Sequence, residues 1–80
     1  MNIGEVVKKR IVELCNQRGI SFNKLSGMSG ITQSTINNIV SGRNKSTTIT
    51  TIKKICDGLG ISVNEFFNSE LFVGLEQEIK

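Results

Sequence analysis

The sequence predicts an all-α protein, a compact bundle of five short helices around one shared core. Apolar residues recur three or four positions apart through most of the 80 residues, which is the spacing of one helix face. A hydroxyl residue flanked by apolar residues, the pattern of a helix N-cap, occurs at three separate places. No segment alternates apolar and polar residues for long enough to indicate a strand. We therefore expect a single helical domain over residues 1–80.

The first helix is predicted from Ile3 to Arg18, because its apolar residues keep helical spacing and Gly19 supplies a stop. Three further starts follow from an N-cap with an apolar residue before it and another four after it: Ile20-Ser21-Leu25, Ile31-Thr32-Ile36 and Ile61-Ser62-Phe66. A fourth start is expected at Thr48, in a helix that Gly60 ends. The tail from Glu70 to Ile79 could add a sixth helix.

Composition excludes several classes of protein. The chain has no histidine and only two cysteines, so four zinc ligands or a Cys/His nucleophile pair cannot be assembled within it. Carboxylates are scattered singly, and Gly27 and Gly30 lack the strand and the Lys-Ser/Thr of a phosphate loop. We expect neither enzyme activity nor a metal, cofactor or small-molecule substrate. No apolar run spans a membrane and no secretory signal is evident, so a cytoplasmic location with reduced thiols is expected.

Charge is distributed unevenly along the chain. Residues 1–54 carry nine Lys/Arg against two glutamates, a net +7, whereas residues 55–80 carry a net −4. The basic part is either a surface for a polyanion or a set of ordinary solvated helix faces, and charge alone does not separate the two. Lys8, Lys9 and Arg10 are expected to be solvated.

The segment from Phe22 to Ser41 combines a small residue at a helix crossing, a glycine for a left-handed turn and apolar residues that hold a second helix. Those residues are Leu25, Ser26, Gly30, Ile31, Ile36 and Ile39. Their spacing resembles the helix-turn-helix of the phage repressor and Cro family of DNA-binding proteins. The alternative is a purely structural helical hairpin. The similarity extends over residues 3–67, including the flanking helices.

Two departures from the family are visible. Phe22 stands near the start of the motif's first helix, where members commonly carry glutamine. Members also often pair a buried arginine in the first helix with a glutamate at the end of the third, and the corresponding positions here hold Cys15 and Val40. The resemblance therefore implies that this ion pair is replaced as a unit by two residues of the core.

The resemblance implies a recognition helix that begins at Gln33. Its polar, uncharged positions are the expected base-contacting residues, namely Gln33, Ser34, Asn37 and Asn38. The expected phosphate-contacting residues flank them and follow them into the next loop: Asn23, Lys24, Thr35, Ser41, Arg43, Asn44 and Lys45. The alternative for these side chains is an ordinary solvated helix face.

The predicted function is that of a sequence-specific, homodimeric transcriptional regulator, most simply a repressor, that binds double-stranded DNA. The expected dimer interface is an apolar cluster near the C-terminus, Phe66, Phe67, Leu71 and Phe72, with residues 69–80 contributing. The alternative for this cluster is that it covers the chain's own core. An alternative function is an antitoxin or adaptor that uses the same fold to hold a partner protein.

Overall fold

Five α-helices follow one another along the chain in a computed structural model that describes residues 1–43 and 46–79. They are α1 (Ile3–Arg18), α2 (Phe22–Ser29), α3 (Gln33–Val40), α4 (Ile49–Leu59) and α5 (Val63–Phe67), followed by a 3-10 helix, η1 (Glu70–Phe72). The described residues contain no strand. The all-helical prediction is confirmed.

The predicted N-caps begin four of these helices. Ser21, Thr32, Thr48 and Ser62 each accept a hydrogen bond from the backbone N–H three residues later. Each bond satisfies one of the donors that a helix start leaves without an intrahelical partner. The positions of α2 to α5 along the chain are therefore set locally, residue by residue.

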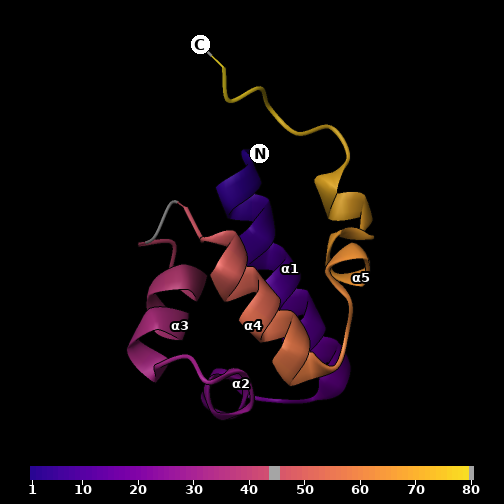
Figure 1. The fold of residues 1–80 in the computed structure, drawn as a ribbon. Helices are drawn as coiled ribbons and strands as arrows, with labels where there is room; N and C mark the ends of the chain where they lie inside the picture. The colour runs from indigo at the N-terminus through magenta and orange to yellow at the C-terminus, as the bar shows by residue number, and fades with distance from the viewer. Residues whose placement is uncertain (44–45, 80) are drawn as a thin grey trace.

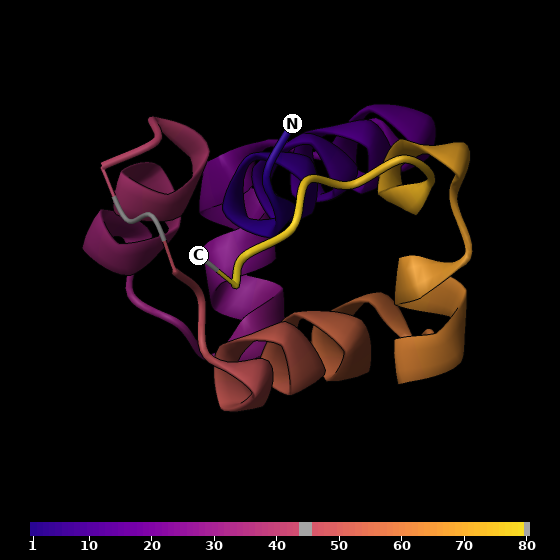
Figure 2. The ribbon, with the colours of Figure 1, turned by 90° about the horizontal axis from the view of Figure 1, so that it is seen from above.

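The longest helices, α1 and α4, form two sides of the bundle, as Figures 1 and 2 show. Helix α2 crosses one end, α3 lies at one edge, and α5 with η1 lies at the opposite edge. The C-terminal segment returns from η1 toward the start of α1, where the Glu76 N–H donates to the Met1 carbonyl. None of the described helices has the length and apolarity needed to cross a membrane.

One apolar core connects all five helices. Cys15 belongs to it, and Val40 packs against it as a partly buried residue. The two positions expected to replace the family's ion pair thus both belong to or pack against this core, although Val40 is only partly buried. The buried members of the core are Val7, Ile11, Leu14, Cys15, Leu25, Ile31, Ile36, Ile39, Ile52, Ile55, Cys56, Leu59, Ile61 and Phe66.

Helix α4 touches the backbone of α2 directly at Gly58. A Cβ atom at Gly58 would lie 2.8 Å from the carbonyl carbon and oxygen of Met28 and 2.9 Å from the Cα of Ser29. Real Cβ atoms do not approach backbone so closely, so glycine is required for this packing distance. The sequence indicated a small residue at Ser26 for helix crossing, but it did not reveal the need for Gly58.

Arg10 is buried, with 7% of its surface exposed, so the expectation that it is solvated is wrong. Its guanidinium donates to the carbonyl oxygens of Phe66 (2.6 Å) and Glu65 (2.8 Å) and forms an ion pair with Glu13. Both carbonyls lie at the end of α5, where the Glu65 carbonyl also accepts from the Asn68 N–H (3.2 Å). Arg10 therefore attaches the short helix α5 to α1.

The C-terminal part of the chain differs from the expected sixth helix and from the expected dimer interface. The sixth helix is only the single turn η1, because Val73 is extended and Gly74 takes a left-handed conformation (φ 75°). Phe66 is fully buried (0% exposed), and Phe67 and Phe72 pack against the same core. Phe66 therefore cannot offer surface to a dimer interface, because the aromatic cluster covers the chain's own core.

Substitution of Gly58 by alanine is expected to destabilise the protein by about 1 to 3 kcal/mol, because backbone atoms of α2 cannot move aside for the new methyl group. Gly27→Ala is the matched control, since nothing lies within 4 Å of its Cβ position in α2. Alanine there is expected to stabilise the helix by about 0.5 to 1 kcal/mol. Urea unfolding of both variants measures the difference, and equal free energies of unfolding would contradict the close α2–α4 contact.

Replacement of Arg10 by methionine is expected to lower the free energy of unfolding by about 2 to 4 kcal/mol, because two carbonyls lose a charged donor. Lys9→Met, at the exposed neighbouring position, is expected to have little effect. Thermal unfolding followed by circular dichroism compares the two variants. An Arg10→Met melting temperature as high as that of Lys9→Met would show that the arginine does not hold α5.

Candidate nucleic-acid interface

Helices α2 and α3 are joined by a tight turn at Gly30. Gly30 has a φ of 67°, in the left-handed region that non-glycine residues rarely adopt. The hydroxyl of Ser26 donates to the Ile31 carbonyl (2.5 Å), and the Ile31 N–H donates back to the Ser26 carbonyl (3.3 Å). Ser26 thus ties the turn to α2, which sets the direction in which α3 leaves it.

One side of α3 is held in the core and the opposite side faces solvent. Ile36 and Ile39 are buried, whereas Gln33, Ser34 and Asn37 are exposed. At about 100° per residue, positions 33, 34, 37, 38 and 41 cover one continuous arc opposite the two isoleucines. The structure therefore brings the four expected base-contacting residues onto one side of one helix, with Asn38 half-buried at its edge.

Two polar residues expected at phosphates also have partners within α3. The Thr32 hydroxyl donates to Thr35 Oγ1 (2.9 Å), and the half-buried Thr35 keeps its own hydroxyl proton for another acceptor. The Ser41 hydroxyl donates to the Asn38 carbonyl (3.2 Å). Both hydroxyl groups therefore already take part in a hydrogen bond within this segment.

Helix α3 ends in a hydrogen-bonded turn. The N–H groups of Gly42 and Arg43 donate to the carbonyls of Ile39 (3.2 Å) and Asn38 (3.0 Å), and Gly42 is left-handed (φ 83°). This is the Schellman arrangement of a helix C-terminus. Arg43 emerges from it exposed. Asn44 and Lys45, the next two expected phosphate contacts, lie outside the described residues.

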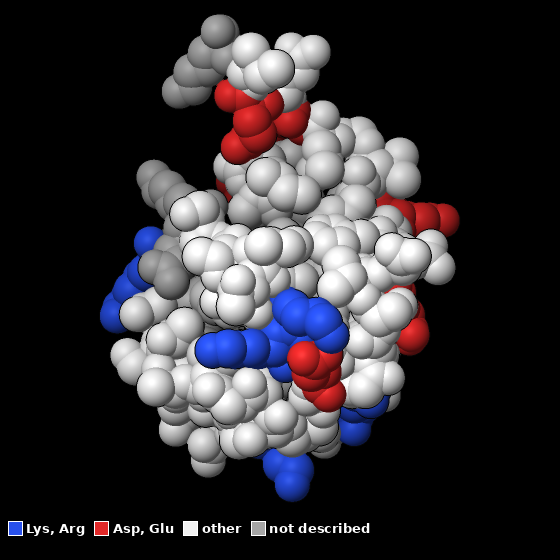
Figure 3. All heavy atoms as spheres, viewed as in Figure 1, with Lys and Arg blue, Asp and Glu red and all other residues white. Residues whose placement is uncertain are grey.

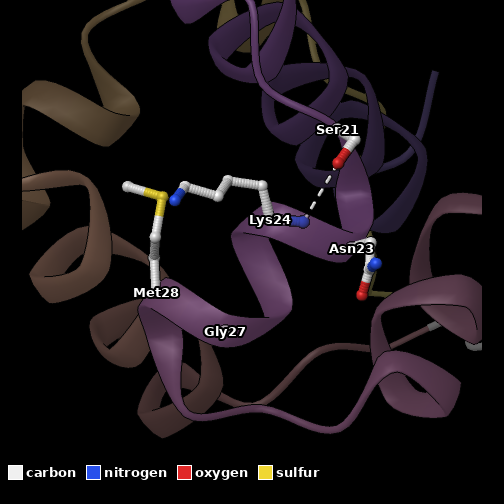
Figure 4. A pocket seen from close by; sticks show the side chains of 5 residues that line it. All are labelled: Ser21, Asn23, Lys24, Gly27 and Met28. Atoms are coloured by element: carbon white, nitrogen blue, oxygen red, sulfur yellow. Dashed lines mark hydrogen bonds between the residues drawn. The ribbon is translucent and has the colours of Figure 1, made fainter.

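Asn23 and Lys24 are exposed near the start of α2, beside the Ser21 cap. They line an open depression together with Gly27 and Met28. Figure 4 shows the Lys24 side chain running along α2 toward Met28, while Asn23 points away on the other side of the helix. The two residues therefore border the same depression, while their side chains point in different directions.

Charged residues are separated across the face seen in Figure 3. Acidic side chains gather around the C-terminal segment and at one edge, whereas lysine and arginine side chains lie over the rest, with one acidic group beside the central basic cluster. That cluster lies over α4, where Lys53 forms an ion pair with Asp57. The acidic residues of positions 55–80 therefore do not form one region, because Asp57 lies on α4 beside Lys53.

The two cysteines are buried free thiols of the core. Burial raises the pKa of the Cys15 thiol and of the Cys56 thiol, so both are held in the protonated form. A protonated, buried thiol is a poor nucleophile and a poor metal ligand. In the described part of the chain, no three His, Cys, Asp or Glu side chains come together to hold a metal ion.

The chain is similar to one family of domains and to one solved structure. The model of the Cro/C1-type HTH DNA-binding domain matches residues 10–70. The crystal structure of the prophage Lp1 protein 11 is similar, with a TM-score of 0.76 and 43% sequence identity. The similarity covers 86% of this chain and 92% of that one. No curated protein matches the sequence.

Proposed function

The chain belongs to the Cro/C1-type helix-turn-helix family of DNA-binding domains, and on that premise we propose that it is a sequence-specific, homodimeric transcriptional repressor. The observation that carries this proposal is the polar, uncharged arc of α3 opposite Ile36 and Ile39. An exposed helix face that serves only solubility ordinarily carries charges. Amides and hydroxyls instead suit the mixed donors and acceptors of base edges in the major groove.

In the proposed complex, α3 enters the major groove with its polar arc against the bases. The amides of Gln33 and Asn38 would each bridge two atoms of an adenine edge, and Ser34 and Asn37 would contact neighbouring bases. Asn23, Lys24, Thr35, Ser41 and Arg43 would contact phosphates, as would Asn44 and Lys45.

A helix-turn-helix reads one half-site of DNA. Two copies related by a two-fold axis would bind two half-sites at a fixed spacing, which would raise the affinity for DNA. We propose that the second copy docks on the C-terminal segment. Val73 and Ile79 are 80% and 89% exposed there, in the segment that follows the half-buried Phe67, Leu71 and Phe72 along the chain. Apolar side chains so exposed are stabilised when a partner covers them. The acidic charge of this segment would also keep it away from DNA.

Gln33→Ala and Arg43→Ala are expected to affect DNA binding in different ways. Gln33→Ala should lose about 1 to 3 kcal/mol of discrimination at one base pair while the salt dependence stays unchanged, because an amide displaces no counterion. Arg43→Ala should weaken binding to all sequences and reduce the slope of log K against log salt by about 0.9.

The measurement is a salt titration on an operator selected from random duplexes and on its single-base variants. Gln17→Ala, at an exposed glutamine of α1, is the control for Gln33→Ala and should change neither property. Full sequence preference in Gln33→Ala would refute α3 as the reading helix.

Sedimentation equilibrium is expected to show a dimer that Val73→Ser combined with Ile79→Ser weakens, because the exposed apolar area of the tail is lost. Ile49→Ser is the control, since Ile49 is also an exposed apolar residue (64%) but lies on α4. A parent chain that stays monomeric at high concentration, or a control that weakens the dimer as much as the tail variant does, would rule out this interface.

A further inference from the structure

We infer that Lys8, on α1, contacts a DNA phosphate beside the turn that ends α3. This inference rests on the proposed function, and it adds a residue from a helix outside the helix-turn-helix motif. The sequence predicted only solvation for Lys8, and no pattern in the neighbouring residues distinguishes it from Lys9.

The ammonium of Lys8 lies at the end of α3. A Cβ atom on Gly42 would stand 3.6 Å from Lys8 Nζ, and Lys8 is half-buried where α1 approaches α3. A half-buried lysine loses side-chain freedom that an exposed lysine keeps. The charge is therefore held at one place, next to the backbone that leads into Arg43.

Three carbonyls at the end of α3 are bonded by the turn itself, without Lys8. The carbonyls of Asn37, Asn38 and Ile39 already accept from the N–H groups of Ser41, Arg43 and Gly42. Within residues 1–43 and 46–79, none of the ion pairs includes Lys8. The ammonium thus keeps donors for an anion from outside the chain.

Two cations from separate elements then lie at the same end of α3. Lys8 comes from α1, and Arg43 follows Gly42 directly in the chain. A DNA phosphate supplies the negative charge that both cations can contact. The polar arc of α3 lies on the same helix, so a backbone phosphate that flanks the reading surface is the ligand this placement suits.

The test compares the salt dependence of DNA binding in the parent, Lys8→Gln, Lys9→Gln and Lys8→Arg. Both glutamine variants remove one positive charge from α1, so any effect of net charge is shared. We expect the slope of log K against log salt to fall by about 0.9 in Lys8→Gln alone and to be retained in Lys8→Arg. The probes are the selected operator and a random-sequence duplex, on which the change should be equal, since a phosphate contact carries no sequence information.

Equal slopes for Lys8→Gln and Lys9→Gln would overturn the inference. If Arg43→Ala still reduces the slope in that case, only the role of Lys8 fails and the proposed function stands. If the parent binds neither duplex in a salt-dependent way, the proposed function itself fails. Circular dichroism melts of all four proteins establish that each variant is folded under the binding conditions.

Discussion

The contact between Gly58 of α4 and the backbone of α2 is the constraint on which the rest of the interface depends. Helices α2 and α3 have eight residues each, too few to persist as isolated helices in water, so packing must hold them. Because α2 lies directly against α4, the turn at Gly30 starts from a defined place. The direction of α3 and the side it exposes follow from that placement.

At the opposite edge of the bundle, a buried arginine holds the short helix α5 against α1. Helix α5 has only five residues, and the Arg10 guanidinium supplies donors to its last carbonyls. Phe66, Phe67 and Phe72 then pack ring against ring, with centroids 5.0 to 6.4 Å apart, and close that edge of the core. The buried arginine and the aromatic cluster together explain why the C-terminal third stays attached without a long helix of its own.

The proposed interface separates two kinds of chemistry. The exposed arc of α3 carries no charge, whereas Lys8 of α1 and Arg43 lie at the C-terminal end of this helix. Charge on the reading surface would bind any DNA backbone, so its absence there favours selectivity, while the surrounding cations supply affinity that does not depend on sequence. Five of the seven acidic residues lie at positions 55–80 of the chain, outside the helix-turn-helix.

The sequence by itself determined the features that depend on neighbours along the chain. The caps at Ser21, Thr32, Thr48 and Ser62, the left-handed Gly30 and the alternation of buried and polar positions along α3 all involve residues within about four positions of one another. The all-helical fold, its five helices and the family of the chain could therefore be predicted. The exposure of Gln33, Ser34 and Asn37 followed from the same periodicity.

Only the tertiary structure decided the features that join distant segments. Gly58 meets Met28, Arg10 meets Glu65 and Phe66, and Lys8 meets Gly42, and no local pattern marks any of these residues. The same is true of Phe66, whose apolar character fits an interface and a core equally well. Helical spacing identifies which side of a helix is buried, but the packing of the other helices decides what that side touches, because such contacts depend on the path of the whole chain.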